Sequence, residues 1–116
     1  MSVRRCWRPV LAAALAALVA SHTAAQQVSL VLAGDTTLDD DAGALIAHGG
    51  DPLAPFAALF AGADLRIANL ECVVATTGAP GRKNYTFRAH PRVLPVLRGH
   101  LDDVTLANNH SGDYGR

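Results

Sequence analysis

The sequence predicts an α/β fold built around a mainly parallel β-sheet. Three short apolar runs, each of a length suited to one strand, alternate along the chain with segments of helical spacing. Strands that alternate with helices in this way are typical of a parallel sheet covered by helices. The length of 116 residues favours one domain at most.

The first half of the chain is expected to form one strand and two helices. The run VSLVLA at 28–33 is apolar without alternation, which is typical of a strand buried on both faces, and a Gly-Asp turn is expected after it. Three aspartates at 39–41 favour the start of a short helix, which the glycine pair 49–50 ends. Within 51–64 apolar side chains recur at helical spacing after Asp51, a good N-cap residue, so a second helix is expected there.

The second half repeats the alternation. A strand at 65–70 follows the second helix directly. A surface loop is expected at 73–84, which is rich in Gly, Thr and Pro, and a short strand at 85–89. A helix weakened by an internal proline is expected at 91–101, and a third buried strand at 103–107.

Residues 1–25 are predicted to be a secretory signal peptide. Three arginines precede the apolar run 10–20, and small residues around Ala25 fit a cleavage site. A membrane anchor is the alternative, but the run is shorter than the roughly 20 apolar residues that span a bilayer. We therefore expect a secreted or periplasmic protein, residues 26–116, without a stable membrane span.

Removal of the leader changes the net charge of the chain. The basic residues fall from ten to seven while all ten acidic residues remain, so a net charge of zero becomes about −3. No basic stripe is left. Because nucleic-acid binding depends largely on neutralising phosphates, nucleic acid is not expected as a partner.

Polar side chains follow each of the three main predicted strands. Asp35 follows the first, Glu71 the second, and Asn109 and His110 the third. Each alone is more often an ordinary turn or surface residue. Since ligands of open α/β sheets bind beyond the carboxyl ends of the strands, their shared placement indicates a site. Two carboxylates, an amide oxygen and an imidazole suit a divalent metal ion such as Mn²⁺, Fe²⁺, Zn²⁺ or Mg²⁺.

Four segments in this order resemble the N-terminal half of a known family: LAGDTTL, DPLAPFAALFAGADLRIANLE, KNYTFRAHP and DVTLANNHSGDYG. The family is the CapA (PGA-cap, poly-γ-glutamate capsule synthesis) family, which is related to the calcineurin-like metallophosphoesterases. The resemblance runs from about Val28 to Gly115. It implies part of an αββα metallophosphoesterase-like sandwich with a mainly parallel sheet and metal ligands on loops at strand ends.

The resemblance also implies roles for individual residues. Asp35 corresponds to a metal ligand, and Glu71 to a second acidic ligand with Asn69 as its competitor. Asn109 corresponds to the amide-oxygen ligand, and His110 to the catalytic or phosphate-contacting histidine.

Two basic residues of the KNYTFR segment, Lys83 and Arg88, are candidates for holding an anionic substrate; a surface charge is the alternative for Arg88. Cys72 stands where the family usually has glycine, so backbone strain is expected there if φ is positive.

The function implied is capsule or poly-γ-glutamate synthesis or export, with an anionic polymer and envelope capsule-synthesis proteins as partners. The family's further histidine motifs lie downstream of DVTLANNHSGDYG, so we expect a fragment with an incomplete metal site. A metal-dependent phosphoesterase acting on an exported phosphate ester is one alternative. A non-enzymatic polymer-binding or scaffold protein of the envelope is the other.

Overall fold

A three-stranded parallel sheet is the centre of the computed structural model, which describes residues 26–115. Its strands lie in the order β1 (Leu30–Thr36), β2 (Leu65–Leu70) and β5 (Asp103–Thr105), and both neighbouring pairs are parallel. The predicted parallel α/β architecture is therefore confirmed. The predicted signal peptide lies outside the described residues. Within the described part, the chain has no helix with the length and apolar character needed to cross a membrane.

The first strand begins and ends later than the sequence predicted. Its pairing with β2 continues beyond Gly34, so the expected turn at Gly34-Asp35 is wrong and Asp35 lies within the strand, opposite Asn69. The register shifts between Leu32 and Asp35. A glycine inside a strand often marks such an irregularity, because the backbone can bend there without losing its place in the sheet.

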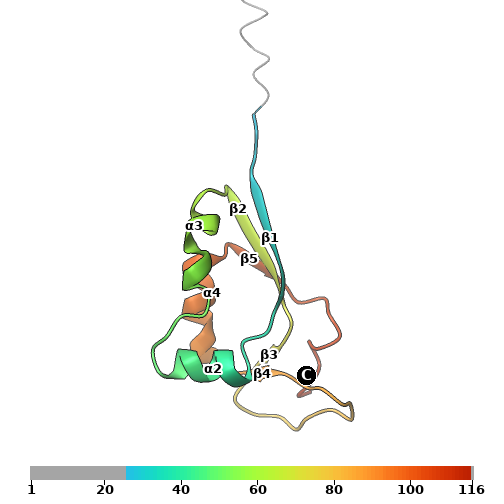
Figure 1. Ribbon diagram of the computed structural model, residues 1–116. Coiled ribbons are helices and arrows are strands. Elements are labelled where there is room, and N and C mark those ends of the chain that lie inside the picture. Colours follow the sequence, from blue (N-terminus) through green and yellow to red (C-terminus); the bar gives the residue numbers. More distant parts are fainter. Residues whose placement is uncertain (1–25, 116) are drawn as a thin grey trace, which may run out of the picture.

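Burial of β1 on both faces was also predicted, and within the described residues this is wrong. Val31 and Ala33 pack against the core, whereas Leu30 and Leu32 are 55% and 71% exposed. Successive side chains of a strand point to opposite faces. Helices α2, α3 and α4 lie together on one side of the sheet in Figure 1, so they cover only one of these two sets.

Two helices connect β1 to β2. Helix α2 (Asp40–Ala47) begins after Asp39, whose Oδ1 accepts a hydrogen bond from the backbone N–H of Asp40 at 2.9 Å. The predicted helix within 51–64 is shorter than expected, a 3₁₀ turn (Ala54–Phe56) followed by α3 (Ala57–Ala61). A proline is the second residue of the 3₁₀ turn, where a missing N–H costs little.

The connection from β2 to β5 carries a second, smaller sheet. Strand β3 (Val73–Val74) pairs in parallel with β4 (Arg88–Ala89), so only the last part of the predicted strand at 85–89 is paired. The last predicted helix forms as a 3₁₀ turn (Pro91–Val93) and α4 (Leu94–His100). Its internal proline is the second residue of α4, where a missing N–H costs little.

The hydrophobic core lies between the sheet and the helices. Cys72 is one of its members, only 3% exposed, and burial raises the pKa of its thiol. Among the described non-glycine residues only Asp40 has a positive φ, so the strain considered for Cys72 does not arise. The buried apolar side chains are those of Leu38, Ile46, Phe60, Ala68, Leu70, Cys72, Ala89, Val93, Leu97 and Leu101.

Candidate functional site

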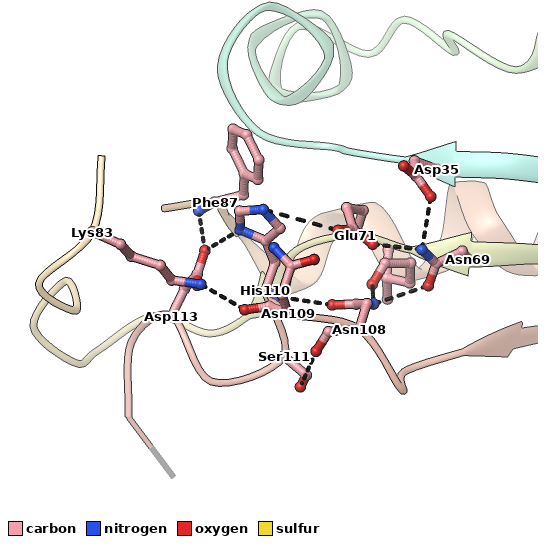
Figure 2. A network of polar contacts seen from close by, with 11 residues as sticks. Asp35, Asn69, Glu71, Lys83, Phe87, Asn108, Asn109, His110, Ser111 and Asp113 are labelled. Atoms are coloured by element: carbon pink, nitrogen blue, oxygen red, sulfur yellow. Dashed lines mark hydrogen bonds and ion pairs between the residues drawn. The ribbon is translucent and has the colours of Figure 1, made fainter. Parts of the chain in front are cut away.

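Two carboxylates meet at the carboxyl ends of β1 and β2. Figure 2 shows Asp35 and Glu71 on either side of the Asn69 amide. The Nδ2 group of Asn69 donates to Asp35 Oδ1 at 2.8 Å and to Glu71 Oε2 at 2.5 Å. Asp35 and Asn69 are partners in the strand register, and Glu71 follows β2 directly. Parallel pairing thus brings together acids that are far apart in sequence.

The orientation of the Asn69 amide follows from its neighbours. Its Oδ1 accepts hydrogen bonds from Asn108 Nδ2 at 2.9 Å and from Thr105 Oγ1 at 3.1 Å. Its Nδ2 group faces two carboxylates. An ionised carboxylate can accept hydrogen bonds but cannot donate them, so a donor has to face it. Since Asn69 Oδ1 is used by the protein and its NH₂ group points to the acids, the geometry favours Glu71 over Asn69 as a metal ligand.

Asn108 ties the segment after β5 to the end of β2. Its Nδ2 donates to Leu70 O at 2.9 Å as well as to Asn69, and its Oδ1 accepts from the backbone N–H of His110 at 2.9 Å. Sequence analysis placed no function on Asn108, although it is the first residue of the asparagine pair. The second, Asn109, is exposed, and its carboxamide has no hydrogen-bond partner among residues 26–115.

The imidazole of His110 lies beside Glu71 and is only 12% exposed. Its Nε2 is 3.9 Å from Glu71 Oε1, and its Nδ1 is 2.7 Å from Asp113 Oδ2. The ring packs against Phe87, with ring centroids 4.5 Å apart. Packing and hydrogen bonding therefore hold one edge of the ring against Asp113 and turn the other toward the acids.

Asp113 is, with Asn108, a residue of this site that sequence analysis missed. It has no exposed surface, and its Oδ2 also accepts from the backbone N–H of Phe87 at 2.7 Å. Burial opposes its ionisation, but contacts with Lys83, His110 and Phe87 N–H outweigh that effect and lower its pKa to about 2. Its Oδ1 contacts Lys83 Nζ as an ion pair without the angular geometry of a hydrogen bond.

The two predicted substrate-binding residues, Lys83 and Arg88, both have their charged groups in contact with other residues of the chain. Lys83 Nζ also donates to the backbone oxygen of Asn109 at 2.5 Å. The guanidinium of Arg88 lies 4.4 Å from the ring centroid of Tyr114 and donates to Gly78 O at 3.3 Å. A substrate contact by either residue stays a prediction, and their present contacts hold the loop before β4 against the C-terminal segment.

A comparison with models of known families identifies one whose description is bacterial capsule synthesis protein PGA_cap, matching residues 29–116. The chain belongs to the PGA_cap family. A search of the curated proteins found no significant match. With this membership, the parallel sheet and its helices are those of a partial α/β fold of the metallophosphoesterase kind.

The donor atoms of this PGA_cap chain suit a hard divalent ion in kind. Asp35 and Glu71 supply carboxylate oxygens that both accept hydrogen bonds from the NH₂ group of Asn69. Asn109 supplies an amide oxygen that has no hydrogen-bond partner within residues 26–115. They are few in number: no group of three or more His, Cys, Asp or Glu side chains within residues 26–115 is arranged to hold a metal ion. The predicted ligands thus fit part of a coordination sphere.

Proposed function

We propose that this PGA_cap chain acts in the synthesis or export of bacterial capsule polymer as an exported envelope protein. We propose further that Asp35, Glu71 and Asn109 bind a divalent ion beside His110. Poly-γ-glutamate is the polymer that the CapA resemblance implies. The observation that carries the proposal is that Asp35 and Glu71, at the strand ends, both accept hydrogen bonds from the same amide NH₂ group, that of Asn69.

Two ionised carboxylates that share one neutral donor attract a cation. Their like charges repel one another, and the partial positive charge of an amide hydrogen offsets this only in part. Asn109 would add a neutral oxygen ligand from the next loop. A divalent ion held by these residues would supply Lewis-acid stabilisation of negative charge on a phosphate or carboxylate oxygen and would lower the pKa of bound water.

The chain's own residues would orient the anionic substrate and move a proton. His110 turns Nε2 toward Glu71, so this nitrogen can exchange a proton with a substrate oxygen held at the strand ends. Lys83 lies on the loop before β4, and Arg88 is the first residue of β4. Both are the proposed contacts for the negative charge of the polymer or phosphate ester.

Calorimetric titration of the purified protein with Mn²⁺, Mg²⁺, Fe²⁺ or Zn²⁺ tests the metal site. Asp35→Asn and Glu71→Gln remove one charge each with little change in shape, and we expect each to weaken binding at least about tenfold. Asp41→Asn is the matched control, because Asp41 is an exposed acid in the first turn of α2. Equal affinity in all four proteins would refute the site.

The capsule role is tested by complementation in an encapsulated strain that lacks its own copy of the gene. The parent gene is expected to restore surface polymer, measured as glutamate released by acid hydrolysis. Glu71→Gln is expected to restore much less polymer at equal protein level in the envelope fraction. Full restoration by Glu71→Gln would separate the capsule role from the metal site, and no restoration by the parent would refute the role itself.

A metal-dependent phosphoesterase is the second candidate. The observation that favours it is the position of His110 Nε2, 3.9 Å from Glu71 Oε1. Hydrolysis of a chromogenic phosphodiester with Mn²⁺ should fall in Asp35→Ala and His110→Ala. Equal rates in parent and variants would reject the hydrolase. Retention of polymer by the parent in the presence of a chelator would instead favour a non-enzymatic polymer-binding protein.

A further inference from the structure

We propose that Arg82 binds an anionic group of the substrate, a carboxylate or a phosphate, beside the candidate metal site. This inference rests on the proposed function, which supplies the anionic substrate. Sequence analysis singled out Lys83 and Arg88 for that task and placed no function on Arg82. The structure distinguishes these cations by what their charged groups contact.

The charged groups of Lys83 and Arg88 are engaged within the chain. The ammonium of Lys83 forms an ion pair with the carboxylate of Asp113 and donates to the backbone oxygen of Asn109. The guanidinium of Arg88 lies 4.4 Å from the ring centroid of Tyr114. Because the pair of Lys83 and Asp113 is neutral as a unit, Lys83 adds little net charge to the site.

The charge of Arg82 is not balanced in this way. Arg82 is exposed, and its guanidinium forms no hydrogen bond or ion pair with any residue of the range 26–115 that the structure describes. The carboxylates of Asp35 and Glu71 repel an approaching anion, so an unpaired cation nearby favours its binding. An arginine suits this task because its fork of N–H groups matches two oxygens of a carboxylate or a phosphate.

The backbone on both sides of Arg82 is fixed to the site. The N–H of Lys83 donates to Gly81 O at 2.9 Å, which closes a γ-turn with Arg82 at its centre. The N–H of Gly81 donates to Asp113 O at 2.7 Å, and Lys83 contacts the side chain of the same aspartate. Figure 2 shows Lys83 reaching from its loop to Asp113, next to His110. A turn held in this way loses little conformational freedom when it binds a ligand, which favours affinity.

Calorimetric titration of the purified protein with poly-γ-glutamate and, separately, with inorganic phosphate tests the inference. Arg82→Gln removes the charge and keeps much of the side chain, and we expect it to weaken binding at least about threefold. Arg98→Gln is the matched control and should bind as the parent does. Arg98 is also an exposed arginine, but it lies in the last turn of α4, which leads to the start of β5 at the opposite end of the sheet.

Three further measurements separate a binding role of Arg82 from a structural one. Urea melts of Arg82→Gln should match those of the parent, because the guanidinium contacts none of the described residues. Arg82→Lys keeps the charge without the fork, so its affinity should lie between those of the parent and Arg82→Gln. Added salt should weaken binding by the parent more than binding by Arg82→Gln, because salt screens exposed charges.

Equal affinities of the parent and Arg82→Gln would overturn the inference and leave the anionic substrate in place. An equal loss in Arg82→Gln and Arg98→Gln would overturn it too, since it would indicate attraction by overall charge, as would a loss of stability that accompanies the loss of affinity. A loss for the polymer alone assigns Arg82 to a carboxylate, and a loss for phosphate alone assigns it to a phosphate ester. A parent that binds neither probe would refute the anionic substrate of the proposed function and this inference with it. The titrations need no metal ion, so the metal site is tested separately.

Discussion

Acid should destabilise this protein through Asp113 in a predictable pH range. The pKa of Asp113 is about 2 in the folded chain against 3.8 for an ordinary aspartate. Because the folded value is the lower one, the ionised carboxylate adds stability above the unfolded pKa. That contribution is lost as the pH falls through the folded pKa. A difference of this size corresponds to about 2 kcal/mol, most of it lost between pH of about 4 and about 2.

The magnitude is a large share of the stability of a small domain, which is about 5–15 kcal/mol. Urea unfolding at a series of pH values, followed by circular dichroism, gives the free energy of unfolding of the parent and of Asp113→Asn. Other carboxylates with lowered pKa values, such as Asp51, contribute equally to both proteins. Between pH 6 and pH 2 the parent should therefore lose about 2 kcal/mol more than Asp113→Asn. Parallel curves for the two proteins would refute the assigned environment of Asp113.

Three further predictions concern packing and the polar network. Leu97→Ala should lower the free energy of unfolding by about 2–5 kcal/mol in urea melts, whereas exposed Leu32→Ala should stay within about 0.5 kcal/mol. Asn108→Ala should lower the free energy of unfolding by about 1–3 kcal/mol in thermal melts, because the Asn108 side chain is hydrogen-bonded both to the end of β2 and to the backbone of His110. Asn109→Ala is the control, and equal losses in the two variants would contradict this. Gly78→Ala should separate the loop before β4 from the C-terminal segment, because a Cβ at Gly78 would lie 2.2 Å from the backbone oxygen of Tyr114. Hydrogen exchange of the backbone amides in that loop should then be faster, and unchanged exchange would contradict this.

Local patterns in the sequence located the three strands of the main sheet, but β5 ends at Thr105 instead of residue 107, and the predicted burial of β5 is wrong because its side chains are exposed or half-buried. The apolar segment at 65–70 became β2 with the same bounds, because a short run that follows a helix directly has few other ways to be buried. The bonds expected of Asp51 form, since its Oδ1 accepts from the N–H groups of Leu53 and Ala54, but they fix the turn before the helical segment, whose N-cap position is Leu53. These features depend on neighbours within a few residues, which the sequence displays.

Family membership could likewise be predicted from the sequence, because the four motifs in this order are specific for the family, whereas each motif alone is not. The position of Asp35 at the same sheet edge as Glu71 followed in outline from parallel strands. Its place inside β1 did not, because a Gly-Asp pair is a common turn and only pairing with β2 shows that the strand continues.

The sequence by itself determined the parallel α/β architecture, the family and the residues that gather at the strand ends. Only the tertiary structure shows that Asp113 is buried, that Lys83 forms an ion pair with it and that Asn108 hydrogen-bonds to Asn69 in the neighbouring strand. The exposure of Leu30 and Leu32 was decided there too. The physical reason is common to all of them: burial and ion pairing depend on segments that meet only after folding, whereas hydrophobic periodicity reports one element at a time.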